Sequence, residues 1–298
     1  MGYLKKTFAL TAAVGSLALF KYSQVKASQR LFEEAFKVER NDPEDHCWLL
    51  KMPYETIHLD SHDHLKLKGI YLPRDHAKFT MVIIHGYHSD AFRMSEYAKA
   101  FYETFDCDLF LPHLRGHGQS EGNTIGYGWL DKEDMKDWLV KLHEKNPGRP
   151  IVVFGLSMGA GCVNFLSCEQ VVDEVKCYIE DCGYSSIYEE LDYQCRKKTH
   201  LPLKVFAKDI DYLMKKYAGY SLRDGDGLYC VSHAKKPMMF IHGLSDDVVP
   251  SEMVFDLYNA CRSEKQLFFV KNARHAHSLS DDRKAYLDVM KQFIEQYL

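Results

Sequence analysis

The sequence predicts an α/β fold, in which a mostly parallel eight-stranded sheet is covered by helices on both faces. Short apolar runs rich in β-branched and aromatic residues alternate with segments of helical periodicity from residue 53 to the C-terminus. Several runs are apolar throughout, which is typical of strands buried on both faces of a parallel sheet. With 298 residues, 46% of them hydrophobic, the chain can bury such a core.

The predicted strands begin with a hairpin. Residues 55–61 and 65–72 alternate between apolar and polar side chains around a polar turn at 62–64, which indicates two antiparallel strands at one edge. Six further apolar runs are predicted as buried strands, at 79–86, 107–112, 151–155, 175–181, 237–243 and 265–272. Helical patterns lie at 91–104, 131–145, 158–171, 251–262 and 280–297. Strands that alternate with helices should run mostly parallel.

One long insertion interrupts this alternation. Residues 184–234 separate two predicted strands by about fifty residues, and a connection of that length should carry its own structure. Apolar side chains recur there at helical spacing, at Phe206, Ile210, Leu213, Met214 and Tyr217. Lysines occupy the other side, at Lys204, Lys208, Lys215 and Lys216. The pattern fits a helix docked on the core through its apolar stripe, a helical cap over a pocket, or both at once.

The N-terminal residues 1–27 resemble a signal peptide or an uncleaved signal anchor. Lys5 and Lys6 precede an apolar run over 7–20, which is short for a membrane span. The run predicts a membrane-anchored or secreted protein that associates with membranes through residues 7–20. An amphipathic helix packed on the domain is the alternative.

Beyond this segment, the sequence predicts a polar linker helix over 28–52 and a folded domain over 53–298. The formal net charge is −4 and no basic stripe is interleaved with aromatic residues, so nucleic acid is not an expected partner. Nine scattered cysteines lack the spacing of a zinc site, and no metal site is predicted. Such cysteine usage is typical of a reducing compartment, which makes a cytoplasmic location the alternative.

A serine between two glycines is the strongest chemical motif. Ser157 follows the predicted strand 151–155 and precedes a helical pattern, with Gly155 and Gly159 two positions to either side. A strand that turns at once into a helix strains the turn residue and crowds these two positions, so glycine is favoured at both. This G-x-S-x-G pattern is a nucleophile elbow, which exposes a serine hydroxyl above the sheet edge. Ser157 is therefore the predicted nucleophile.

A serine hydroxyl needs a base to take its proton, and the base needs an acid to orient it. Asp246 and Asp247 follow the predicted strand 237–243, and His275 and His277 follow the next strand. Loops at the carboxyl ends of parallel strands open on one rim, where the serine also lies. We expect Asp246 to be the acid and His275 the base. Asp247 could cap the next helix, and His277 could line the pocket or face solvent.

The reaction also needs two N–H donors for the oxyanion that develops on the substrate. The residue after the nucleophile, Met158, should supply one. The other should come from the loop after strand 79–86, where the His85-Gly86 step can turn the backbone so that the Tyr87 N–H faces the serine. Both donors are backbone groups, so side-chain substitutions at Tyr87 and Met158 would test this role poorly.

Four stretches together resemble the α/β-hydrolase family. They are IIHGYHSD (83–90), LRGHGQSEG (114–122), GLSMG (155–159), and the pair HGLSDDVVP (242–250) with ARHAHS (273–278). The resemblance implies an α/β-hydrolase fold with a helical cap at 184–234, with Asp246 as the triad acid and His275 as the base. Within the family the chain is similar to bacterial acyl esterases and prolyl-oligopeptidase-like hydrolases. Arg115 and His117, in the second stretch, are not expected to be catalytic.

The predicted activity is that of a serine hydrolase which cleaves an ester or thioester of a small-molecule acyl substrate, with no cofactor. A serine peptidase or amidase of prolyl-oligopeptidase-like type is the first alternative, because it uses the same catalytic groups. A non-catalytic binding protein on the same scaffold is the second, although the complete set of Ser157, Asp246 and His275 argues against it.

Overall fold

The computed structural model describes residues 21–40 and 47–298 of the chain, and these divide into two compact units. The larger unit comprises residues 38–190 and 223–298. The smaller unit comprises residues 191–222 together with the described N-terminal residues up to Lys37.

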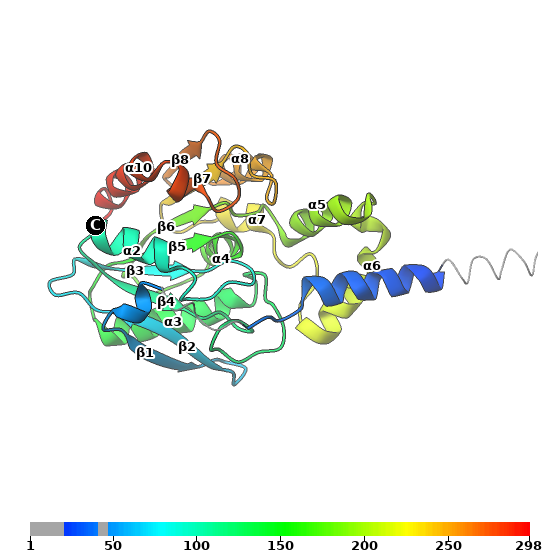
Figure 1. Ribbon diagram of the computed structural model, residues 1–298, viewed down its shortest axis with the longest axis horizontal. Helices are drawn as coiled ribbons and strands as arrows, with labels where there is room; N and C mark the ends of the chain where they lie inside the picture. The colour runs from blue at the N-terminus through cyan, green and yellow to red at the C-terminus, as the bar shows by residue number, and fades with distance from the viewer. Residues whose placement is uncertain (1–20, 41–46) are drawn as a thin grey trace, which may run out of the picture. The chain divides into compact units, whose positions relative to one another are not determined.

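The larger unit is built on an eight-stranded sheet (Figure 1). Its strands are β1 (Glu55–Asp60), β2 (Lys66–Leu72), β3 (Phe79–Ile84), β4 (Cys107–Pro112), β5 (Ile151–Leu156), β6 (Val175–Asp181), β7 (Met238–Gly243) and β8 (Lys265–Val270). They lie in the order β1-β2-β4-β3-β5-β6-β7-β8. β2 pairs antiparallel with both β1 and β4, and all other pairs are parallel. The predicted hairpin and mostly parallel sheet are confirmed.

The burial of each strand follows its sequence pattern. All residues of β3, β5 and β7 are buried, as expected of apolar runs in the middle of a sheet. β1, at the edge, alternates between exposed and half-buried residues. The parallel register sets Ile84 of β3 beside Gly155 of β5, and Leu156 of β5 beside Asp181 of β6. The carboxyl ends of the central strands therefore meet at one rim, directly before the serine.

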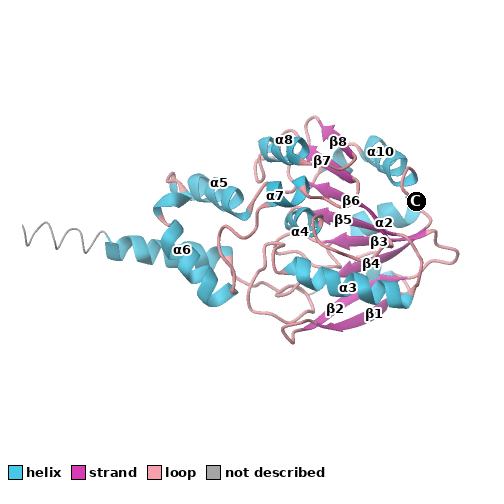
Figure 2. Cartoon of the chain, turned by 180° about the vertical axis from the view of Figure 1, so that it is seen from behind, coloured by secondary structure: helices cyan, strands magenta, loops and turns pink. Residues whose placement is uncertain are grey.

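Helices cover both faces of this sheet, as two opposite views show (Figures 1 and 2). The helical elements of the larger unit are η1 (Leu49–Lys51), α2 (Ser95–Thr104), α3 (Asp131–Lys145), α4 (Met158–Leu166), α7 (Gly227–Ser232), α8 (Ser251–Ala260), α9 (Ser278–Asp281) and α10 (Arg283–Glu295). On one face, α2 and α10 bury Phe101, Tyr286 and Phe293 in a core shared with Phe154 of β5. α3, α4, α7 and α8 pack against one another in sequence order.

The smaller unit is helical. A helix over residues 21–35 is joined by η2 (Leu203–Val205), α6 (Ala207–Leu213) and a π-helical turn, η3 (Met214–Ala218). Helix α5 (Ile187–Thr199) begins in the larger unit and ends in this one. The Gln24 amide donates to the Val205 carbonyl, and the Ser28 hydroxyl lies 3.3 Å from an Asp209 carboxylate oxygen. The helix over 21–35 therefore packs on the η2–α6 segment.

The structure corrects two predictions in this region. Phe206, Ile210, Leu213 and Met214 are buried as the apolar stripe predicted, but Tyr217 is 57% exposed. The π-turn widens the helix after Leu213, so Tyr217 is rotated out of the stripe. The linker helix predicted over 28–52 instead ends at residue 35, and its described part extends back to residue 21.

Two further predictions concern the insertion over 184–234 and the N-terminal segment over 1–27. Within 184–234, α7 belongs to the larger unit, and only 191–222 belongs to the smaller one. The apolar run over 7–20 lies outside the described residues. Among residues 21–40 and 47–298, no helix is both long and apolar enough to cross a membrane.

Candidate active site

Ser157 occupies a strained turn between β5 and α4. Its φ of 56° and ψ of −115° lie where non-glycine residues are rarely found. A Cβ atom on Gly155 would lie 2.1 Å from the Gly159 carbonyl oxygen, and one on Gly159 would lie 2.2 Å from the Ile84 carbonyl oxygen. Neither position has room for a side chain. The glycines are therefore required by the crowding that the G-x-S-x-G pattern predicted.

The structure brings His275 into contact with this serine. His275 Nε2 lies 2.8 Å from Ser157 Oγ, and His275 Nδ1 lies 2.7 Å from Asp246 Oδ2. The three residues come from the turn after β5, the loop after β7 and the loop after β8. They form one continuous chain of hydrogen bonds from the hydroxyl to the carboxylate. The side chain of His275 is 18% exposed, whereas that of Asp246 is fully buried.

Several donors hold Asp246 in its ionised form. Burial alone would raise the pKa of this carboxyl group, but hydrogen bonds from His242 and His275 act in the opposite direction. The backbone N–H groups of Val248 and Val249 both donate to Oδ1 at 2.9 Å. Together these contacts hold the Asp246 pKa below its ordinary value. Asp246 is therefore a buried carboxylate at neutral pH.

The neighbouring residues in both loops point elsewhere. Asp247 is exposed, and helix α8 begins at Ser251 with Pro250 as its N-cap residue, so a capping role for Asp247 stays a prediction. His277 is exposed at the start of α9, with Nδ1 3.3 Å from Ser280 Oγ. Of the alternatives left open for His277, the structure favours a position facing solvent.

The loop after β3 approaches the serine through Gly86. A Cβ on Gly86 would lie 3.2 Å from Ser157 Cβ, so this backbone runs close beside the hydroxyl. His85 fixes the loop, because its Nδ1 lies 2.8 Å from the Gly86 carbonyl oxygen and its Nε2 accepts from the Leu114 N–H at 3.0 Å. These two partners require a neutral ring with the proton on Nδ1. Burial accordingly lowers the His85 pKa.

The two expected oxyanion donors follow β5 and β3, at Met158 and Tyr87. Met158 is the first residue of α4, and the N–H groups of a helix's first turn have no partner within the helix. Tyr87 follows Gly86, and its ring stacks on His88 with centroids 3.9 Å apart. A role for their N–H groups in binding an oxyanion stays a prediction.

Arg115 and His117 are held in structural interactions. The Arg115 guanidinium donates to both Asp134 carboxylate oxygens, at 2.7 and 2.8 Å, and to Asp63 at 2.9 Å. His117 is buried, which lowers its pKa to about 4, and its Nδ1 lies 2.9 Å from the Arg115 carbonyl oxygen. Neither side chain reaches the hydrogen-bonded chain of Ser157.

Two groups of potential metal ligands occur among the described residues. One consists of Cys182, Asp246 and His275, but His275 Nδ1 and Asp246 Oδ2 are already hydrogen-bonded to each other. The other joins His62 to Asp63 and Asp134. Arg115 binds both of these carboxylates, so its guanidinium occupies the place that a cation would take.

Sequence reasoning missed a buried polar layer next to Asp246. His242 of β7 is fully buried, and its Nε2 lies 2.9 Å from the Val249 carbonyl oxygen and 3.4 Å from Asp246 Oδ2. Glu180 and Asp181, at the end of β6, are also fully buried. Burial raises the Glu180 pKa to about 8 and the Asp181 pKa to about 6. The sequence signal for this layer was the pair of acids at the end of the otherwise mostly apolar run VKCYIED (175–181).

Comparisons with known proteins agree with this architecture. Residues 75–179 match the family model described as serine aminopeptidase, S33. An uncharacterized protein of Bacillus subtilis, YqkD, is 29% identical over 77% of this chain and 75% of its own length. Protein bem46 of Schizosaccharomyces pombe is 22% identical over 93% of this chain and 87% of its own length.

Solved structures share the fold. The Pyrococcus furiosus esterase Pf2001 superposes with a TM-score of 0.69 at 19% identity, over 88% of this chain and 97% of the esterase. An acylaminoacyl peptidase superposes with a TM-score of 0.61 at 18% identity, over 82% of this chain but only 41% of the peptidase. With its nucleophile elbow on an eight-stranded sheet of this topology, the chain has the α/β-hydrolase fold, and residues 75–179 resemble a family of serine hydrolases with this fold.

Proposed function

We propose that the protein cleaves a carboxylic ester or thioester through an acyl-enzyme, with Ser157 as nucleophile, His275 as base and Asp246 as the orienting acid. The observation that carries this proposal is the chain of hydrogen bonds from Ser157 Oγ through His275 to Asp246, at 2.8 and 2.7 Å. Both distances lie within the range that proton transfer between a nucleophile and its base requires.

The partners of His275 determine where its proton lies. An ionised Asp246 can only accept hydrogen bonds, so His275 Nδ1 must carry the proton in that contact. Nε2 is then unprotonated and accepts the hydrogen bond of Ser157 Oγ–H. This neutral tautomer is the one that a general base needs.

The reaction follows from this arrangement. Ser157 Oγ attacks the acyl carbon as its proton passes to His275 Nε2, and the backbone N–H groups of Tyr87 and Met158 bind the oxyanion. The His275 imidazolium, stabilised by Asp246, then protonates the leaving alcohol or thiol. Water attacks the acyl-enzyme by the same route in reverse, releasing the carboxylic acid and restoring the free hydroxyl.

A peptidase or amidase is the second candidate. The matching family model is described as a serine aminopeptidase, and one structural neighbour is an acylaminoacyl peptidase. The same three residues can cleave an amide, since His275 could protonate a leaving amine as readily as an alcohol. Against it, this chain covers less than half of that peptidase. The non-catalytic alternative has no observation in its favour.

A substrate panel separates these candidates. We expect p-nitrophenyl esters of rising acyl length to be hydrolysed faster than aminoacyl-p-nitroanilides, as followed by release of the chromophore. Ser157→Ala should lower turnover of the preferred series by about 10⁴-fold or more, because the nucleophile is lost. Ser280→Ala, which alters an exposed serine of α9, should retain activity.

The outcomes are distinct. Faster cleavage of the anilides would assign the protein to the peptidases. No turnover of either series by the wild-type chain, or undiminished turnover by Ser157→Ala, would contradict the proposed function.

A further inference from the structure

The charges of the chain are strongly segregated between the two units. The described residues of the smaller unit, 21–37 and 191–222, contain eleven Lys and Arg but only five Asp and Glu. The whole chain has 38 basic and 42 acidic residues and a formal charge of −4. A surplus of six positive charges therefore lies on a minor part of an acidic protein. Residues 21–37 contribute two of these surplus charges and residues 191–222 contribute four, although the two segments are more than 150 residues apart in the sequence.

All eleven basic side chains of the smaller unit are exposed: Lys21, Lys26, Arg30, Lys37, Arg196, Lys197, Lys198, Lys204, Lys208, Lys215 and Lys216. Ion pairs inside the unit join Arg196 to Asp192, Lys198 to Glu34, and Lys215 to Asp211. The five acids of the unit can offset at most five of its eleven cations, so its described residues carry six more positive than negative charges. Because all eleven cations are exposed, this net positive charge lies on the surface of the unit.

Exposed aromatic rings accompany these cations. The side chains of Tyr22, Tyr212 and Tyr217 are 64%, 63% and 57% exposed. Lys26 lies over the Tyr22 ring at 5.8 Å, and Lys216 lies over the Tyr217 ring at 4.9 Å. Tyrosine is favoured at membrane–water interfaces, where its ring contacts apolar matter and its hydroxyl stays hydrated. Exposed tyrosines next to lysines are therefore suited to a lipid headgroup layer.

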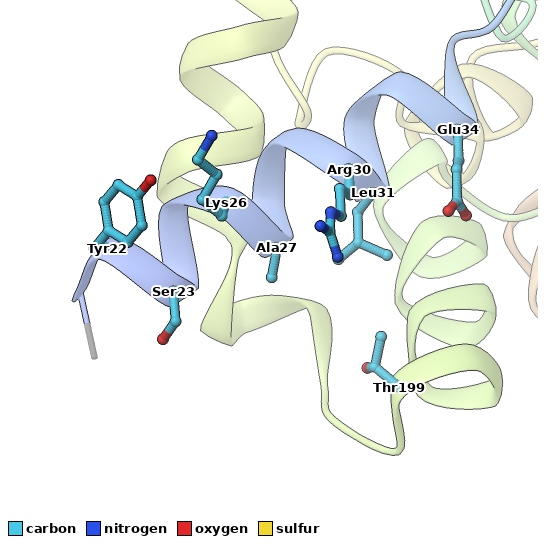
Figure 3. Close-up of a pocket in the computed structure, with 8 residues that line it drawn as sticks. All are labelled: Tyr22, Ser23, Lys26, Ala27, Arg30, Leu31, Glu34 and Thr199. Carbon is cyan, nitrogen blue, oxygen red and sulfur yellow. The ribbon is translucent and has the colours of Figure 1, made fainter. Parts of the chain in front are cut away.

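The helix over 21–35 also borders an open groove (Figure 3). The groove has a volume of about 610 Å³, and Thr199 at the end of α5 lines its opposite side. Ser23 and Ala27, both small, point to the side of the helix where Thr199 lies. Arg30 adds a guanidinium to the same groove, and guanidinium groups bind phosphate through paired hydrogen bonds. The lining combines two cations, Lys26 and Arg30, with one acid, Glu34, which also pairs with Lys198. The charged lining is therefore net positive, as a site for a lipid phosphate requires.

From these observations we propose that the smaller unit is a peripheral docking surface for an anionic lipid bilayer. Its surplus cations attract acidic headgroups, its exposed tyrosines enter the headgroup layer, and the groove beside Arg30 receives a lipid phosphate. This contact differs from anchoring by the apolar run over 7–20, because it depends on lipid charge and on salt. It is also independent of the proposed hydrolase activity.

Vesicle sedimentation of the full chain tests this proposal. We expect the wild-type protein to bind vesicles of phosphatidylcholine mixed with phosphatidylserine, to bind pure phosphatidylcholine far less, and to be released by added NaCl. The triple variant Lys204→Gln/Lys208→Gln/Lys216→Gln should lower partitioning into the mixed vesicles about 100-fold, since each surface cation contributes about fivefold.

A matched control removes the same charge elsewhere. Lys51→Gln/Lys235→Gln/Lys271→Gln alters three exposed lysines of the larger unit and should retain wild-type partitioning. Circular dichroism should show native helix content for both triple variants. Equal binding to both vesicle types, no binding to either, or an equal loss in both triple variants would overturn the proposal.

Discussion

Two fully buried carboxyl groups near Ser157 differ sharply in ionisation. Asp246 has a lowered pKa, whereas the Glu180 pKa is raised to about 8. Asp246 accepts hydrogen bonds from two backbone N–H groups and from His275, with His242 3.4 Å away. Glu180 accepts one, from the Gly183 N–H at 2.8 Å, and its second oxygen has no partner among the described residues.

This difference shows that burial alone does not decide the charge of a carboxyl group. Transfer from water disfavours both carboxylates, and the number of donors aimed at each one determines the outcome. Asp246 can therefore orient the His275 imidazole and stabilise its charged form. Glu180, with its pKa near 8, stays protonated at neutral pH and itself adds no negative charge to this buried layer.

The largest expected effect comes from neutralising the ionised member of the pair. Asp246→Asn should lower kcat for the preferred substrate about 10⁴-fold, because an amide no longer favours the His275 tautomer that can accept the serine proton. Asp247→Asn, an exposed neighbour, should change kcat by no more than about twofold. Steady-state kinetics of both variants gives the comparison. A greater loss of kcat in Asp247→Asn would instead identify Asp247 as the acid.

A smaller effect, on stability, comes from the neutral member. The folded protein keeps the Glu180 proton to about pH 8, whereas the unfolded chain releases it near the ordinary value of 4.5. Between these pH values the folded state binds more protons, so this group makes wild-type stability fall as pH rises. Glu180→Gln removes this pH-dependent contribution to the free energy of unfolding. The free energy of unfolding of the variant minus that of the wild type should therefore increase as pH rises across this window.

Urea unfolding at a series of pH values measures this difference. Glu189→Gln, which alters an exposed glutamate of α5, serves as the control and should keep a constant difference from the wild type. A constant difference for Glu180→Gln as well would mean that Glu180 is ionised in the folded protein, and the comparison with Asp246 would fail.

Much of the fold was predictable because its signals are local. The helix at 131–145 has the bounds expected from its periodicity, and the eight strands lie where apolar runs were found. Ser157, Asp246 and His275 could be chosen because each lies in the turn or loop after a strand, and the strand ends of a parallel sheet share one rim. The crowding of Gly155 against Gly159 follows from the same local turn.

What could not be predicted depends on distant partners. The exposure of Tyr217 follows from a π-turn that no simple periodicity reveals. The contrast between Asp246 and Glu180 depends on donors such as His242 and His275, which approach them only in the folded chain. The basic surface of the smaller unit likewise arises when residues 21–37 meet residues 191–222.

The central claim is that Ser157 is a nucleophile activated by His275. A fluorophosphonate probe followed by peptide mass spectrometry tests it most directly, because the probe forms a covalent bond only with an activated hydroxyl. We expect a single adduct on Ser157, its loss in Ser157→Ala, and much slower labelling in Asp246→Asn. An adduct on another residue, or labelling that persists in Ser157→Ala, would contradict the account.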